Sequence, residues 1–183
     1  MNQHITQAIH LEGRLTRDLI PFIAAEDNLD EMMLLAKQLS ESAHGNIISY
    51  SKKIFIPLTM LCRDVCHYCT FAKPPTKGQK AYLSSEQVLE IAHAGEKAGC
   101  KEALFTLGDK PELRYKVAKQ ELNSMGYDST LDYLHDMSKL VLENTSLLPH
   151  LNPGVMDLKQ IEKLRNVSAS QGIMLESVSN RLS

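Results

Sequence analysis

The 183-residue sequence has no apolar run of about 18 residues, the length that a bilayer-spanning helix needs. Met1 to His10 is polar and lacks the apolar core of a signal peptide, so we expect no secretory signal, no membrane association and a cytoplasmic location. Neither sign of charge dominates, because the sequence contains 20 Lys and Arg and 22 Asp and Glu. The net charge of −2 disfavours a nucleic-acid partner. The hydrophobic content of 43% excludes a disordered chain.

Cysteine is also scarce, and three of the four cysteines lie together. Cys62, Cys66 and Cys69 form a C-x3-C-x2-C pattern within LCRDVCHYCTF. In a cytoplasmic chain such clusters hold metals or do redox chemistry more often than they form disulfides. Three thiolates on one loop can hold an iron–sulfur cluster and leave one iron open. The alternatives are a Cys3His zinc site that uses His67, or three inert thiols. Cys100 has no partner in sequence, and we expect it in the core.

The chain divides into a helical extension at residues 1–50 and an α/β domain at residues 51–183. Helical spacing of apolar residues predicts a helix over about 28–42 and a shorter one near 15–24. Strands are expected at 53–58, 103–107, 147–151 and 173–176, and capping patterns at Ser84 and Asp157 mark helices between them. This alternation predicts a parallel sheet with crossover helices, in which ligands bind at the carboxyl ends of the strands.

The cysteine pattern, with an aromatic residue before its last cysteine, resembles that of the radical S-adenosylmethionine enzymes. Further segments resemble one branch, the 7,8-didemethyl-8-hydroxy-5-deazariboflavin (FO) synthases, as the CofG subunit or the corresponding half of a fused enzyme. These segments are IPLTMLCRDVCHYCTF, EALFTLGDKPELRY, MGYDSTLDYL, LLPHLNPGVM and MLESVSNRLS. The resemblance extends from about residue 54 to residue 183. It implies a partial TIM-type barrel, of which about four β/α units are present here after the N-terminal helices.

The resemblance assigns roles to individual residues. Cys62, Cys66 and Cys69 would hold a [4Fe–4S] cluster, whose open iron binds S-adenosylmethionine. The implied contacts of this cofactor come from five residues: Tyr68 by the adenine, Gly108 and Asp109 at the methionyl amine, Asn152 at the site, and Glu176 at the ribose. All of them except Gly108 also have a simpler alternative.

Those alternatives are packing for Tyr68, a helix N-cap for Asp109, a turn for Asn152 and a surface charge for Glu176. Arg63 is expected to pair locally with Asp64.

The implied reaction is that of a carbon–nitrogen lyase. A 5′-deoxyadenosyl radical abstracts hydrogen from the adduct of tyrosine with 5-amino-6-ribitylamino-uracil, and ring closure with release of ammonia follows. The implied partners are this small-molecule adduct, the CofH enzyme or a fused CofH half that makes it, and an electron donor. The resemblance names no catalytic side chain.

Two further hypotheses remain open. One is another radical enzyme, such as CofH, a menaquinone-pathway enzyme or a biotin-synthase-like enzyme, and the other is a non-catalytic metal-binding module. The family subunit has more strands than this sequence. We therefore expect a barrel truncated at its C-terminal side, with a poorly stable and catalytically impaired chain as the consequence.

Overall fold

The computed structural model describes residues 17–25, 27–66 and 69–174, and its chain forms two compact units, Met1–Tyr50 and Ser51–Ser183. The first unit contains the short helices η1 (Arg17–Leu19) and α2 (Ile20–Ala24), followed by α3 (Leu29–His44). The Asn28 side chain accepts a hydrogen bond from the backbone N–H of Glu31, which fixes the start of α3. Both helical stretches expected in this region are thus present.

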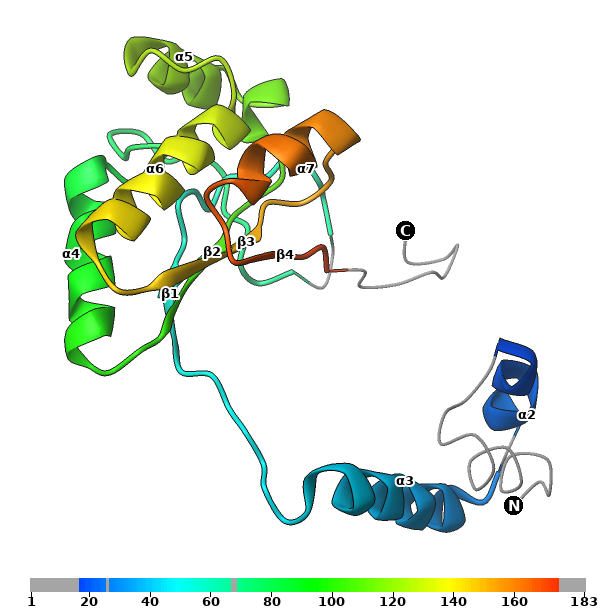
Figure 1. The fold of residues 1–183 in the computed structure, drawn as a ribbon. Helices are drawn as coiled ribbons and strands as arrows, with labels where there is room; N and C mark the ends of the chain where they lie inside the picture. The colour runs from blue at the N-terminus through cyan, green and yellow to red at the C-terminus, as the bar shows by residue number, and fades with distance from the viewer. Residues whose placement is uncertain (1–16, 26, 67–68, 175–183) are drawn as a thin grey trace. The chain divides into compact units, whose positions relative to one another are not determined.

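The second unit is built on four parallel strands in the order β1-β2-β3-β4. Their bounds are β1 Lys53–Ile56, β2 Glu102–Thr106, β3 Leu148–Asn152 and β4 Ser170–Gln171. The helices between them are α4 Ser85–Lys97, η2 Pro111–Leu113, α5 Lys116–Ser124, α6 Thr130–Asn144 and α7 Leu158–Arg165. This is the predicted α/β alternation with crossover helices (Figure 1).

Local sequence explains where these helices begin and end. Ser84 with Gln87 and Asp157 with Gln160 form the two predicted capping boxes at the starts of α4 and α7. Gly99 follows α4 with a φ of 79°, a conformation that glycine adopts without strain. The capping patterns therefore mark both helix starts correctly.

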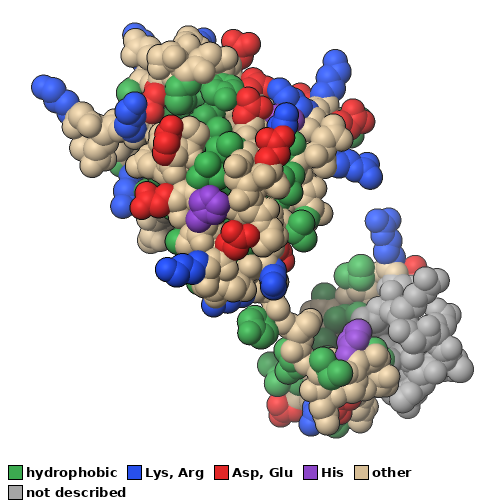
Figure 2. Space-filling model, turned by 60° about the vertical axis from the view of Figure 1, so that its left-hand side comes forward, with side chains coloured by type: hydrophobic (Ala, Val, Ile, Leu, Met, Phe, Trp, Pro, Cys, Tyr) green, Lys and Arg blue, Asp and Glu red, His purple; other side chains and the backbone are tan. Residues whose placement is uncertain are grey.

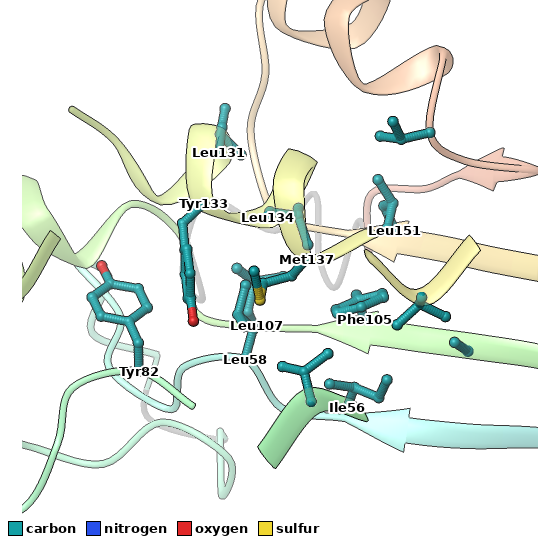
Figure 3. Packing of buried hydrophobic residues seen from close by; sticks show 14 of the residues in the cluster. Ile56, Leu58, Tyr82, Phe105, Leu107, Leu131, Tyr133, Leu134, Met137 and Leu151 are labelled. Atoms are coloured by element: carbon teal, nitrogen blue, oxygen red, sulfur yellow. The ribbon is translucent and has the colours of Figure 1, made fainter. Parts of the chain in front are cut away.

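Helices α4, α6 and α7 form one layer against the sheet (Figure 1). The strands alternate, so that Ala103 and Phe105 of β2 and Leu151 of β3 face this layer and are fully buried. Tyr82, Tyr133 and Met137 belong to the same core (Figure 3). Cys100 is buried in this core, as expected.

The face of the sheet that points away from the helices carries the alternate side chains of β2 and β3. Thr106 of β2 is paired in register with Asn152 of β3, and Leu104 with His150. These residues are only partly buried, whereas their neighbours along the strands are fully enclosed. The face that binds ligands in a barrel of this type is therefore polar near the carboxyl ends of β2 and β3.

The fourth strand differs from its predicted position. Strand β4 is Ser170–Gln171, whereas Ile173 and Met174 of the predicted 173–176 strand are outside the ladder and exposed. The last backbone bond to β3 is donated by Gly172 N–H to Leu151 O, and Pro153 beyond the end of β3 has no N–H to donate. The apolar run thus follows the strand rather than forming it.

The surface of the second unit carries both signs of charge. Lys and Arg are interspersed with Asp and Glu on the face that Figure 2 shows, without one continuous patch of either sign. Among the residues that the structure describes, no helix has the length and apolarity to cross a membrane.

Candidate functional site

The cysteine loop lies directly beyond the carboxyl end of β1. Cys62 is partly buried, while Cys66 and Cys69 are exposed. The backbone N–H groups of Asp64 and Ala72 approach the Sγ atoms of Cys62 and Cys69, each at 3.4 Å. Such N–H···S bonds stabilise negative charge on a sulfur ligand. The loop thus carries donors suited to thiolate chemistry.

Gly108 brings the end of β2 against this loop. A Cβ atom built on Gly108 would lie 1.9 Å from the backbone oxygen of Leu61 and 2.8 Å from the Cβ of Cys62. The Gly108 N–H also donates to Thr59 O at 3.2 Å. Only glycine permits this approach to the cysteine loop. The expected contact of Gly108 with the methionyl amine stays a prediction.

Asp109 follows Gly108 and is buried, with 6% of its surface exposed. Its Oδ2 accepts two hydrogen bonds from the Arg63 guanidinium, from Nη2 at 2.9 Å and from Nε at 3.2 Å. The backbone O of Asp109 accepts a third from the Arg63 N–H at 2.9 Å. The N-cap alternative for Asp109 is wrong, because the residue that precedes η2 is Lys110.

The second carboxylate oxygen of Asp109, Oδ1, differs from Oδ2 in its hydrogen bonding. Oδ1 is buried and has no hydrogen-bond partner among the residues that the structure describes. Gly154, just past β3, packs against this side chain, since a Cβ there would lie 2.7 Å from the Asp109 Cβ. A buried carboxylate oxygen without a donor is costly, so this position favours a donor group from a ligand.

Asn152 ends β3 on the polar face of the sheet, as predicted. Its surroundings orient the amide nitrogen toward Gly172 O and toward Nε2 of His150, both at 3.3 Å. A Cβ on Gly172 would lie 2.6 Å from the Asn152 side chain. Asn152 therefore has local partners at the β3–β4 boundary, and its predicted contact with the cofactor stays a prediction.

Two predicted site residues, Tyr68 and Glu176, lie outside the described residues, as does His67 of the zinc alternative. The strand at whose end Glu176 was expected stops at Gln171.

Two arginines make contacts at this site that the sequence analysis did not predict. Arg63 lies 3.9 Å from the expected partner Asp64 but makes its shorter contact, at 2.9 Å, with Asp109. Arg114 donates from Nη1 to the backbone oxygens of Arg63 and Asp64, at 3.1 and 3.3 Å. These contacts join positions 46 to 51 residues apart, and no local pattern signals them.

The loop after the cysteines, residues 73–80, contributes to a pocket of about 400 Å³. Leu61 and Thr59 line its other side, which places the pocket next to the cysteine loop. Thr59 is buried and donates to Ala81 O at 2.7 Å, so this wall is tied to the core.

No family model matches the chain. The sequence is 54% identical over 148 residues to an FO synthase from Nocardia farcinica, which covers 79% of this chain and 17% of that protein. It is 48% identical over 136 residues to the 7,8-didemethyl-8-hydroxy-5-deazariboflavin synthase of Methanopyrus kandleri, covering 74% of this chain and 41% of that protein. The chain belongs to the FO synthase family. It spans less than half the length of either FO synthase.

Solved structures agree on the fold of this FO synthase family member. Methylornithine synthase (PylB) matches with a TM-score of 0.63 at 16% identity, over 96% of this chain and 48% of that one. The FeFe-hydrogenase maturase HydG from Carboxydothermus hydrogenoformans matches with a TM-score of 0.62 at 23% identity, over 92% of this chain and 36% of that one. The α/β fold is that of the radical S-adenosylmethionine barrels, in part.

Family membership implies a [4Fe–4S] cluster and S-adenosylmethionine, and the residues present fit both. Three cysteine side chains supply the type of ligand that such a cluster takes, and the sulfur atoms of Cys62 and Cys69 accept backbone N–H groups. Asp109 Oδ1 offers a buried acceptor on the residue that follows Gly108. Within residues 17–25, 27–66 and 69–174, no three His, Cys, Asp or Glu side chains lie close enough together to hold a metal ion, so the structure does not bring the Sγ atoms of Cys62, Cys66 and Cys69 together.

Proposed function

We propose that this chain carries the cluster-binding and cofactor-binding part of an FO synthase of the CofG type. The observation that carries the proposal is the joining of the C-x3-C-x2-C loop to the carboxyl end of β2. There the backbone of Gly108 approaches Leu61 and Cys62, and the buried Asp109 Oδ1 has no donor in the described part of the chain. A structural zinc site is closed by its four protein ligands and does not require an unsatisfied acceptor such as Asp109 Oδ1 near its cysteines.

In this proposal Cys62, Cys66 and Cys69 hold the [4Fe–4S] cluster, and Asp109 Oδ1 accepts a hydrogen bond from the amino group of S-adenosylmethionine. The bound cofactor supplies radical abstraction of hydrogen. Asp109 orients the methionyl end, and the partly buried face at Thr106 and Asn152 borders the space where the substrate binds. The protein supplies ligation, orientation and exclusion of water.

The proposed substrate is the adduct of tyrosine with 5-amino-6-ribitylamino-uracil, and the reaction is a carbon–nitrogen lyase reaction that releases ammonia. The support is the identity of 46–54% to enzymes named FO synthase. A CofH activity, separate or fused, makes the adduct, and an electron donor reduces the cluster. These partners belong to the whole enzyme, of which the chain spans a part.

Anaerobic reconstitution with iron and sulfide tests the proposal. We expect about four irons per chain and an EPR signal of the reduced protein that shifts when S-adenosylmethionine is added. The variant Cys66→Ser should lose most of this iron, whereas Cys100→Ala removes a buried thiol outside the loop and should keep it. Stoichiometric zinc, or a folded chain that takes up no cluster, would contradict the proposal.

A further inference from the structure

The peptide group between Arg63 and Asp64, in the cysteine loop, is hydrogen-bonded at both its oxygen and its N–H. Its oxygen, Arg63 O, accepts a hydrogen bond from Arg114 Nη1 at 3.1 Å. Its nitrogen, Asp64 N–H, approaches the Sγ of Cys62 at 3.4 Å. The guanidinium of Arg114 and the sulfur of Cys62 therefore lie at opposite ends of the same peptide dipole.

This arrangement is fixed by contacts on both sides of the loop. The Arg63 backbone N–H donates to Asp109 O, and the Arg63 side chain is paired with the Asp109 carboxylate. Arg114 adds a second bond to Asp64 O at 3.3 Å, and its guanidinium lies over the Tyr115 ring, 5.1 Å from the centroid. Rotation of the Arg63–Asp64 peptide would break its bond to Arg114 and its contact with Cys62 Sγ, while the bonds to Asp109 hold Arg63 in place on the other side of its Cα.

The electrostatic consequence follows from the direction of the dipole. A cation at the carbonyl oxygen polarises the peptide and strengthens donation by its N–H, because hydrogen bonds in a chain reinforce one another. Hydrogen bonds to the sulfur ligands and nearby positive charge stabilise the more negative, reduced cluster and raise its potential.

We propose that Arg114 is a positioning residue that orients and polarises the Arg63–Asp64 peptide toward Cys62, and so raises the reduction potential of the bound cluster. The inference rests on the proposed function, since it needs a cluster on Cys62. The hydrogen bonds of Arg114 go to the backbone oxygens of Arg63 and Asp64, and among the described residues none goes to a thiol or to Asp109.

The experiment compares the full chain with Arg114→Ala, Arg114→Lys and the control Arg165→Ala, an exposed arginine of α7. An EPR-monitored redox titration of the reconstituted proteins measures the midpoint potential. Arg114→Ala should shift it to more negative values, and Arg114→Lys should restore part of the shift because a lysine provides a charge but not the planar fork. An unchanged potential in Arg114→Ala would overturn the proposal.

A second readout uses the protein before reconstitution. Amide hydrogen exchange at Asp64 should become about tenfold faster in Arg114→Ala, because the bonds that hold this peptide are lost, and should stay the same in Arg165→Ala. If the wild-type chain takes up no cluster, the proposed function fails, while this readout still decides the role of Arg114. Equal exchange rates in Arg114→Ala and wild type would refute the claim that Arg114 fixes the orientation of the Arg63–Asp64 peptide.

Discussion

The Arg63 guanidinium and the Asp109 carboxylate form a two-point contact, in which Nη2 and Nε both donate to Oδ2, at 2.9 and 3.2 Å. The contact joins the loop after β1 to the end of β2. It satisfies one oxygen of a buried carboxylate, whereas Oδ1 receives no hydrogen bond from any residue that the structure describes. Because a buried charge is tolerated only when it is paired, Arg63 is what permits a carboxylate at this position.

Removal of the Asp109 charge should affect both folding and cofactor binding. Asp109→Asn keeps the shape of the side chain but replaces an ion pair with Arg63 by a neutral contact. We expect the free energy of unfolding to fall by about 1–3 kcal/mol and the affinity for S-adenosylmethionine to fall about tenfold. Denaturant unfolding and anaerobic equilibrium dialysis measure the two effects. The matched control is Asp128→Asn, at an exposed position, and equal affinities in the two variants would contradict the role given to Asp109.

A side chain at position 108 should displace the cysteine loop. In Gly108→Ala the added Cβ meets a backbone oxygen, Leu61 O, at 1.9 Å, so the main chain itself has to shift. We expect a large loss of iron per chain on reconstitution and a destabilisation of about 2 kcal/mol or more. In Gly126→Ala nothing lies within 4 Å of the new Cβ, so only the strain of a positive φ is added there. Iron content should be unchanged in that control, and normal iron binding by Gly108→Ala would show that the close approach is not needed.

Local sequence signals predicted most of the fold. The capping patterns at Ser84 and Asp157 are short-range signals, and the structure confirms both. Strands β1, β2 and β3 lie within one or two residues of their predicted bounds. Strand β4 was misplaced because an apolar run at 173–174 indicates strand propensity, whereas pairing with β3 decides where a strand forms.

The candidate site shows the same division between local and long-range information. The C-x3-C-x2-C spacing and Gly108 are visible in sequence because neighbouring residues carry the signal. The partners of Asp109 and of the Arg63 carbonyl are set by tertiary structure, which brings Arg63 and Arg114 to the same loop from positions 51 residues apart. A single sequence contains no sign of such a pairing, so the arginines were found only in the structure.

The tyrosine cluster in the core makes stability sensitive to alkaline pH. Tyr133 donates to Leu83 O at 2.6 Å, and its ring contacts those of Tyr82 and Tyr127. Burial, with smaller contributions from Tyr127, Glu86 and Glu121, raises the pKa of Tyr133 from 10.0 to about 12. Burial also raises the pKa of Tyr82.

A raised tyrosine pKa means that folding favours the neutral phenol. The stabilisation is therefore complete below the unfolded pKa of 10.0 and is lost as the pH rises toward the folded value of about 12. For Tyr133 alone the loss amounts to about 1 kcal/mol by about pH 11. Urea unfolding between about pH 8 and 11 should show this decline, and Tyr133→Phe should be less stable at neutral pH but decline less steeply. The exposed Tyr50→Phe serves as the control. An identical decline in Tyr133→Phe and wild type would mean that the Tyr133 phenol ionises in the folded chain without cost.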